Sequence, residues 1–353
     1  MIYIPHSSTD VFWNFGLEYY LIKEKRLTDP VFLFWQNTPC LMLGKFQNPI
    51  VEINLEYLKS HKLDLVRRKS GGGTIYTDLG TFQYTFIQPE SSLEIKFSEF
   101  IAPVLRALQD LGLDAEFKGR NDLLLAGKKI SGTAQYKEAG YLVHHGSLLF
   151  DTNIEALVES CQVDPDKIAS KGIASIRERV TNIRDHLSKD MTAADFKAYM
   201  VDSVIRQSAS TPRVDSVGHQ SVDFVGRQSV IDQVYHLTDD DRAAAQRLGQ
   251  EEFARPQSFW LYDPKFDIEL KNRFTGGQVV LKLTVKAGII RAIQISGDFF
   301  ASIDLSAVET ALTGLAAKPE AVEKALRGLD FDQKVYQITA HDIASLFNRL
   351  DYK

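Results

Sequence analysis

The sequence predicts an α+β fold, with a mixed β-sheet and flanking helices in a large N-terminal domain and a small α/β domain at the C-terminus. Strand-like and helix-like segments alternate up to about residue 205, and alternating apolar runs resume after residue 258. Between them, residues 208–241 are rich in Ser, Asp and Gln. We therefore expect domains at residues 1–207 and 255–353, joined by a linker or insertion at 208–254.

The N-terminal elements follow from their apolar spacing. Residues 10–25 carry apolar positions near the helical period, and residues 97–111 form an amphipathic helix that ends before Gly112. Residues 31–35, 41–44 and 82–87 have the composition or alternation of strands. These elements predict helices that flank a sheet.

The C-terminal elements are predicted in the same way. Residues 278–285 and 289–296 are strand-like and flank a Lys-Ala-Gly turn, which indicates a hairpin. Helical patterns follow at 308–316 and 321–328. The hairpin and these helices predict a domain of about 95 residues, within the usual domain size range.

Composition narrows the class of protein. The chain has 353 residues, 44% apolar and 25% charged, which is sufficient for a sizeable core. A net charge of −5 argues against general nucleic-acid binding. No stretch approaches the ~20 apolar residues of a membrane span or has the form of a signal peptide, so we expect a cytoplasmic protein without a membrane partner. Cys40 and Cys161 lack metal-ligand spacing, which argues against a zinc site or a disulfide framework.

The most informative segment is residues 67–76. Three successive glycines, Gly71 to Gly73, follow the paired arginines Arg67 and Arg68. Glycines let main-chain N–H groups approach phosphate or carboxylate oxygens, and arginines add fixed positive charge. The spacing matches neither the P-loop nor the dinucleotide motif. Taken alone, the run fits an anion cradle or a tight turn.

A second motif occupies residues 119–132. Its apolar run at 123–126, a Gly-Lys turn and a return at Ile130 predict a β-hairpin. Lys129 then opens the returning strand, with Asn121 and Asp122 at the start of the other strand. These groups can converge on one site, whereas Lys128 is expected to be a solvated turn residue.

The two motifs, in this order, resemble the Arg-Arg-x-Ser-Gly-Gly-Gly and Gly-Arg-Asn-Asp…Lys-x-Ser-Gly signatures of the lipoate–protein ligases. Residues 43–49, 144–150 and 171–182 are similar to three further segments of that family: a first strand and turn, a central hairpin strand and an adenylate-binding loop. Residues 273–277 and 297–300 resemble its bacterial C-terminal accessory domain. The ordered set is more specific than any one motif.

The resemblance implies a catalytic domain of the biotin and lipoate ligase type and an ATP-dependent reaction. Such a ligase condenses lipoate with ATP, releases pyrophosphate and forms lipoyl-AMP. It then passes the lipoyl group to a lysine of a lipoyl domain in a 2-oxoacid dehydrogenase complex or of a glycine-cleavage H protein. Octanoate is a second possible acyl substrate.

The resemblance also implies roles for individual residues. Lys129 would be catalytic, contacting the lipoate carboxylate and the α-phosphate and stabilising charge in both transition states. Asp122, together with phosphate oxygens, would hold Mg²⁺. The implied substrate- and ATP-binding residues are Arg68, Ser70, Gly71, Gly72, Gly73, Thr74, Ile75, Tyr76, Asn121, Asp122, His145, Lys171 and Gly172.

Other residues keep alternatives open. His144 and His145 lie on one predicted strand, so one faces the core or pocket and the other faces away. The family usually has His-Asp where this chain has Thr77-Asp78. We expect Thr77 and Thr81 at the rim of the site. The missing histidine permits a second hypothesis, a catalytically weakened protein that binds the acyl group or the acceptor.

Two enzyme alternatives share the predicted fold. A cysteine-dependent octanoyl- or lipoyltransferase would use a thiol nucleophile and no ATP, but Cys161 has no signature base nearby, and we expect a buried or inert thiol. A biotin–protein ligase is a weaker alternative because its glycine motif differs.

Overall fold

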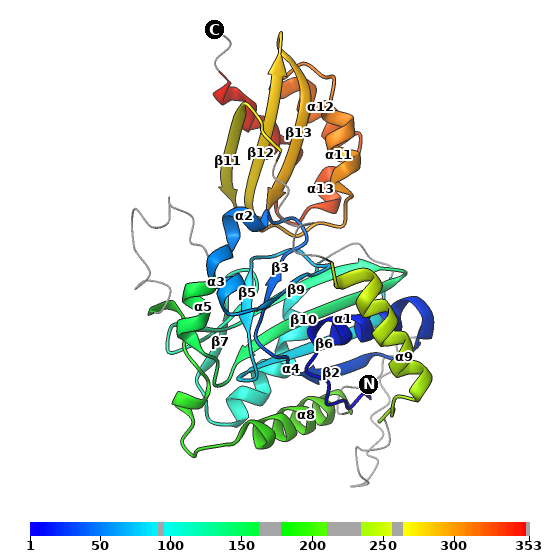
Figure 1. Ribbon diagram of the computed structural model, residues 1–353, viewed down its shortest axis with the longest axis vertical. Helices are drawn as coiled ribbons and strands as arrows, with labels where there is room; N and C mark the ends of the chain where they lie inside the picture. The colour runs from blue at the N-terminus through cyan, green and yellow to red at the C-terminus, as the bar shows by residue number, and fades with distance from the viewer. Residues whose placement is uncertain (91–94, 162–177, 210–233, 256–263, 351–353) are drawn as a thin grey trace, which may run out of the picture.

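The computed structural model describes residues 1–90, 95–161, 178–209, 234–255 and 264–350. A large N-terminal domain carries a smaller C-terminal domain on one end (Figure 1). None of the described helices is both long and apolar enough to cross a bilayer.

The main sheet of the N-terminal domain is mixed, as predicted. Its strand order is β1-β2-β6-β10-β9-β8-β7, in which β1 pairs parallel with β2 and every other neighbouring pair is antiparallel. The strands are β1 (Ile2–Tyr3), β2 (Val31–Trp35), β6 (Thr81–Pro89), β7 (Ala115–Lys118), β8 (Asp122–Leu125), β9 (Lys128–Glu138) and β10 (Tyr141–Leu149).

Helices cover both faces of this sheet. Phe32 and Phe34 of β2 point to one face, where they share a core with α4 (Phe97–Asp110) and α8 (Ala193–Ala209). Leu33 and Trp35 alternate to the other face and pack with α1 (Val11–Tyr20) and its extension η1 (Leu21–Lys25). All five residues of β2 are therefore buried. Strands buried on both faces typically consist of an unbroken run of apolar residues, and β2, with the sequence Val-Phe-Leu-Phe-Trp, is such a strand.

A second, three-stranded sheet lies between the main sheet and the C-terminal domain. Its order is β4-β3-β5, with β3 parallel to β4 and antiparallel to β5. The elements of this layer are β3 (Cys40–Leu43), α2 (Pro49–Glu52), α3 (Leu55–Ser60), β4 (Asp64–Arg67), β5 (Ile75–Thr77) and α5 (Ile154–Ser160). The glycine run joins β4 to β5, so this layer positions it.

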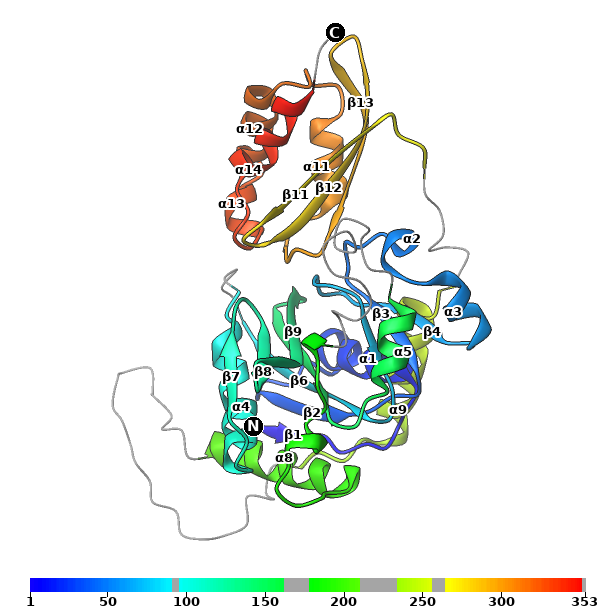
Figure 2. The same ribbon diagram turned by 90° about the vertical axis from the view of Figure 1, so that its left-hand side faces the viewer.

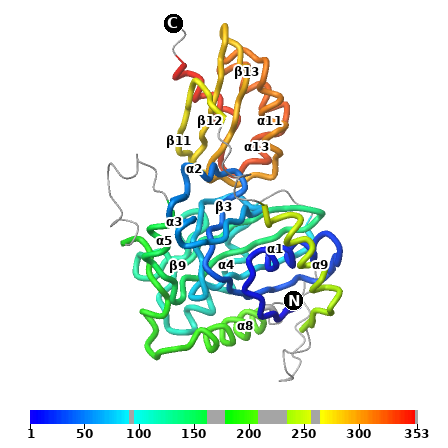
Figure 3. The backbone as a smooth tube through the Cα atoms, viewed as in Figure 1, coloured from blue at the N-terminus to red at the C-terminus, as the bar shows by residue number. Residues whose placement is uncertain are grey.

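The expected linker at 208–254 requires a correction. Within it, α9 (Asp239–Leu248) and η4 (Gly249–Phe253) pack against α1, far away in sequence (Figure 3). The contact is close, because a Cβ at Gly16 would lie 2.1 Å from the Ala245 carbonyl oxygen. Burial of Leu248 and Phe253 contributes roughly 1.5–3 kcal/mol each. Residues 239–253 thus belong to the N-terminal core, and residues 210–233 lie outside the described residues.

The C-terminal domain is an antiparallel sheet, β11-β12-β13, covered by helices on one face (Figure 2). The predicted hairpin is present, with Ala287 and Gly288 at φ 50° and 71° in its turn. The elements are β11 (Ile268–Phe274), β12 (Gly277–Lys286), β13 (Ile289–Gly297), α11 (Leu305–Leu312), α12 (Pro319–Arg327), α13 (Phe331–Lys334), α14 (Ala340–Ser345) and η5 (Leu346–Arg349). The helix predicted at 308–316 begins and ends earlier because Asp304 caps it, accepting from the Ser306 N–H.

One loop docks the C-terminal domain onto the N-terminal domain. The Phe299 ring stacks on Phe46 with centroids 4.9 Å apart, and the Gly297 N–H donates to the Phe46 carbonyl at 2.9 Å. The Arg120 guanidinium lies over the Phe300 ring, 4.7 Å from its centroid, and donates to the Gly276 carbonyl. The C-terminal domain therefore contacts both sequence motifs.

Candidate active site

The glycine loop between β4 and β5 is built around Arg68. This guanidinium is 6% exposed and donates to the carbonyls of Met42 at 2.7 Å and of Gly73 at 2.8 Å, with a longer bond to Gly71. Burial lowers the pKa of Arg68 to about 10, so the group stays charged at neutral pH. Arg68 therefore holds the loop and also adds positive charge beneath it.

The three glycines of the loop differ in how tightly the structure constrains them. A Cβ at Gly71 would lie 2.1 Å from the Phe299 carbonyl oxygen of the C-terminal domain. Gly72 has φ +90°, which side chains rarely adopt. A Cβ at Gly73 would meet nothing within 4 Å, so its backbone lies beside open space. Only part of the run is thus explained by turn and domain packing.

Ser70 and Thr74 fix the two ends of the loop. The Ser70 hydroxyl lies 2.7 Å from Nε2 of His145, whose Nδ1 is 3.5 Å from a Glu18 carboxylate oxygen on α1. Thr74 donates to Gln47 at 2.9 Å, and the same Gln47 oxygen accepts from the Gly44 N–H. These hydrogen bonds tie the loop to β10 and to the turn after β3.

The second motif forms the predicted hairpin, but its turn is one residue earlier than expected. Ala126 and Gly127 have φ 50° and 73°, and the returning strand begins at Lys128. Lys129 faces inward on β9, with its ammonium 2.8 Å from an Asp122 carboxylate oxygen. Their side chains are 40% and 36% exposed, so solvent and ligands reach both.

Both motifs line one pocket. Of the residues predicted to bind substrate, its wall includes Arg68, Gly72, Gly73, Thr74, Ile75, Asn121, Lys129 and His145. Ser70, Gly71, Tyr76 and Asp122 are not among the lining residues, while Lys171 and Gly172 lie outside the described residues. Asn121, Lys129 and the glycine loop therefore meet at one pocket, and Asp122, the third group expected beside Asn121 and Lys129, contacts the Lys129 ammonium.

The rest of the wall was not predicted as site residues. Phe15, Trp35, Met42 and Ala134 give the pocket an apolar lining, and Gln83, Gly132, Thr133, Gly146 and Ser147 complete it. Gly146 and Ser147 directly follow His145, so their strand already pointed to the pocket. Phe15 on α1 carries no local signal, because only tertiary packing decides which face of that helix meets the pocket.

Comparison with known protein families identifies the family of this chain. Residues 10–205 match the Lipoyl protein ligase A/B catalytic domain, and residues 263–347 match the Bacterial lipoate protein ligase C-terminus. A curated relative, lipoate-protein ligase LplJ of Bacillus subtilis, is 34% identical over 98% of this chain and 99% of its own length. The chain belongs to the lipoate–protein ligases. Because the lipoate–protein ligases are enzymes, we treat this chain as an enzyme and set aside the hypothesis of a catalytically weakened binding protein.

Solved structures share the fold of this ligase. Plasmodium falciparum LipL1, solved with lipoate, aligns with a TM-score of 0.73 at 18% identity, covering 92% of this chain and 93% of LipL1. A lipoate-protein ligase A solved with ATP aligns with a TM-score of 0.57 at 17% identity, over 74% of this chain and 98% of the other. At these identities the likeness concerns the fold alone.

Thr77 and Thr81 do not lie at the rim of the site. Both are fully buried. Thr77 accepts from Asn37 at 2.8 Å and lies 3.3 Å from the Cys40 sulfur, and Thr81 bonds to Thr152 at 2.8 Å. The expectation was wrong because Thr77 at the end of β5 and Thr81 at the start of β6 both turn their side chains into the interior.

The two histidines face opposite ways, as their alternation predicts. His145 lines the pocket. His144 packs on the other face, stacked on Phe100 at 5.0 Å and 2.8 Å from the Gln135 amide nitrogen. Burial holds the pKa of His144 well below its usual value, which keeps this ring neutral. His144 is therefore a core residue of this ligase.

The described cysteines are unsuited to nucleophilic catalysis. Burial raises the pKa of Cys40 and of Cys161 to about 12, which leaves almost no thiolate at neutral pH. Neither is among the residues that line the pocket. The structure thus gives no support to a cysteine-dependent transferase.

The end of the predicted adenylate-binding loop reaches Lys129. Residues 162–177 lie outside the described residues, Arg177 among them, and Arg179 is exposed. Just after it, Val180 forms a parallel bridge with Lys129, and the Thr181 N–H donates to the Lys129 carbonyl at 3.2 Å. The last residues of that predicted loop therefore pair with the strand that carries Lys129.

Proposed function

We propose that this ligase activates lipoate with ATP and transfers the lipoyl group to a lysine of an acceptor protein. In the first step a lipoate carboxylate oxygen attacks the α-phosphorus of ATP, the bond to the β-phosphate oxygen breaks, and pyrophosphate leaves. In the second step the acceptor amine attacks the acyl carbon of lipoyl-AMP, AMP leaves, and the amine loses a proton. Both steps need positioning and charge stabilisation rather than a protein nucleophile.

The observation that supports this proposal most strongly is the shared pocket. A cation at Lys129, an open backbone at Gly73 and an apolar wall around Phe15 and Trp35 meet in one space. An apolar wall suits a lipoyl or octanoyl chain, and the ammonium suits a carboxylate beside an α-phosphate. The acyl chain and the carboxyl–phosphate junction of an acyl-adenylate thus each have a matching surface.

Lys129 is the proposed catalytic residue. In the present structure its ammonium pairs with Asp122 at 2.8 Å. During adenylation it would turn toward the carboxylate and the α-phosphate, whose negative charge it would stabilise. A partly exposed ion pair is weak, of the order of 0–1 kcal/mol, so this exchange of partners costs little.

Asp122 fits Mg²⁺ only in part. Its carboxylate is one oxygen donor, and among the described residues no group of three or more His, Cys, Asp or Glu side chains is assembled to hold a metal. Mg²⁺ commonly uses one or two carboxylates with phosphate oxygens and water, so nucleotide phosphates would supply most of its ligands. A bound Mg²⁺ would neutralise phosphate charge, and Asp122 is the proposed protein contact.

The proposed acceptors are lipoyl domains of 2-oxoacid dehydrogenase complexes and glycine-cleavage H proteins. One structural neighbour, from Thermoplasma acidophilum, was described as a lipoate protein ligase with its E2 lipoyl domain. The test incubates the purified protein with ATP, either lipoate or octanoate, and a panel of such acceptors. We expect pyrophosphate release and an acyl mass increase on one acceptor lysine. Acylation without ATP, or no pyrophosphate with either acid, would contradict the proposal.

A further inference from the structure

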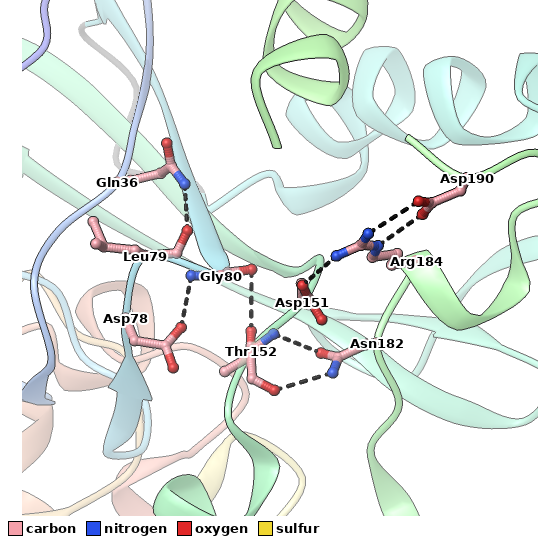
Figure 4. Close-up of polar contacts among 9 residues, drawn as sticks. All are labelled: Gln36, Asp78, Leu79, Gly80, Asp151, Thr152, Asn182, Arg184 and Asp190. Atoms are coloured by element: carbon pink, nitrogen blue, oxygen red, sulfur yellow. Dashed lines mark hydrogen bonds and ion pairs between the residues drawn. The ribbon is translucent and has the colours of Figure 1, made fainter. Parts of the chain in front are cut away.

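Asn182 occupies a junction between three parts of the site. Its side-chain oxygen accepts from the Thr152 N–H at 2.9 Å, and its amide nitrogen donates to the Thr152 carbonyl at 3.0 Å (Figure 4). We call this pair of hydrogen bonds the Asn182 clamp. It holds the Thr152 backbone. Asn182 is also absent from the pocket wall.

The clamp continues toward the catalytic lysine. Thr181, the preceding residue, donates its N–H to the Lys129 carbonyl, and Val180 bridges Lys129 in parallel register. On its other side Lys129 pairs with Leu124 of β8. The backbone of Lys129 is therefore held between the hairpin and the segment that Asn182 anchors.

The clamp also continues toward the glycine loop. The Thr152 hydroxyl donates to the Gly80 carbonyl at 3.4 Å (Figure 4). It also bonds to Thr81 at 2.8 Å, and the Gly80 carbonyl accepts from the N–H groups of residues 150 and 151. Asp78 accepts from Gly80 at 2.9 Å and from the Asn153 N–H at 3.0 Å. Asp78 directly follows β5, the strand that leaves the glycine loop.

We infer that Asn182 is a positioning residue that fixes Lys129 relative to the glycine loop. The chain of bonds runs from Asp78 through Thr152 and Asn182 to Thr181 and the Lys129 backbone. Since catalysis by an ammonium depends on placement, a shift of the strand start would lower the adenylation rate without altering the acyl pocket. This inference rests on the proposed function of Lys129.

The experiment is a double-mutant cycle in the full-length protein. Asn182→Ala removes both clamp bonds, and Arg184→Ala is the matched control. Arg184 lies two residues further on, and its partly exposed side chain pairs with Asp151 at 2.7 Å and Asp190 at 2.9 Å without entering the clamp. Adenylation is followed by lipoate-dependent ATP–pyrophosphate exchange in the parent and in Lys129→Ala, together with thermal unfolding.

We expect Asn182→Ala to lower the saturated exchange rate about tenfold, with the lipoate KM within about twofold, as misplacement of a catalytic group predicts. Arg184→Ala should leave both unchanged. In the Lys129→Ala background Asn182→Ala should have almost no further effect, because the group it positions is gone. Asn182→Asp keeps the hydrogen-bond acceptor but loses the donor, so its exchange rate should lie between those of the parent and Asn182→Ala. If Asn182→Ala does not fold, Asn182→Asp replaces it in the cycle.

If Asn182→Ala lowers the exchange rate by the same factor in the parent and in Lys129→Ala, the inference is overturned and the role of Lys129 is unaffected. An unaltered rate in Asn182→Ala, or an equal loss in Arg184→Ala, would overturn it as well. If Lys129→Ala itself keeps the parental exchange rate, the proposed role of Lys129 falls first and the inference with it.

Discussion

The glycine loop and the β8–β9 hairpin end at the same pocket but differ in how their charged groups are held. Arg68 is buried and donates to three main-chain carbonyls, whereas Lys129 is 40% exposed and pairs with one carboxylate. A group bound to several backbone oxygens cannot leave without loss of structure. A partly exposed ammonium can change its partner at little cost.

The glycine loop held by Arg68 thus has the properties of a scaffold, and Lys129 has those expected of the proposed reacting group. The loop presents backbone in a fixed shape, and in the proposed reaction the hairpin supplies a cation, Lys129, that exchanges Asp122 for the substrate. Preorganised backbone with one adjustable charge is an arrangement suited to stabilising charge that develops during reaction.

The largest expected effect is that of Lys129→Ala. Adenylation should fall by several orders of magnitude, because a desolvated contact to the reacting charge is worth a few kcal/mol. The unfolding temperature should barely change. Rates of ATP–pyrophosphate exchange and a melting curve measure both effects. Activity within about threefold of the parent, an effect of about 0.6 kcal/mol, would remove Lys129 from its assigned role.

Removal of the C-terminal domain should have the next largest effect. This domain touches the glycine loop through Phe299 and the hairpin motif through Arg120. A chain ending at Arg255, which keeps η4, should lose roughly tenfold or more in adenylation, yet transfer lipoyl groups from supplied lipoyl-AMP nearly as well as the parent. Both half-reactions are measured on protein shown to be folded.

Gly71→Ala tests the same contact with a single Cβ, which would collide with the Phe299 carbonyl and disturb docking. It should reproduce the truncation in part. Equal losses in the two half-reactions would assign the domain to stability alone.

Arg68→Lys should have a smaller and different effect. Lysine keeps the charge but cannot reach three carbonyls from one planar group. We expect about 1–3 kcal/mol of destabilisation from the unsatisfied carbonyls and a higher KM for ATP, with most of the saturated rate retained. Chemical denaturation and initial rates provide the two measurements. An unchanged melting curve with a greatly reduced saturated rate would show that Arg68 acts on the reaction directly.

The smallest expected effect is that of Cys161→Ala. With its pKa raised to about 12 by burial, this thiol is protonated at neutral pH and cannot act as a nucleophile. Adenylation and transfer should stay at parental rates. Loss of transfer with adenylation intact would revive the cysteine-dependent mechanism.

Local patterns predicted the hairpin, and the resemblance to lipoate–protein ligases placed Lys129 and the glycine loop in one site. The apolar run at residues 123–126, a Gly turn and the return strand are determined by neighbours in sequence, and so is the opposite orientation of His144 and His145. By contrast, the burial of Thr77 depends on how two sheets meet. The docking of α9 on α1 depends on Gly16 and Gly249, whose close approach joins segments over 200 residues apart. Sequence spacing carries no record of such contacts.

The most direct test of the account measures Lys129→Ala and Arg68→Lys side by side, with the adenylation rate at saturating ATP and lipoate and the dissociation constant for ATP determined for each. We predict that Lys129→Ala lowers the saturated adenylation rate while its affinity for ATP stays within about tenfold of the parent. Arg68→Lys should bind ATP more weakly while keeping most of the saturated rate. If both variants lose the same quantity to the same extent, the division between a fixed loop and a reacting lysine is wrong.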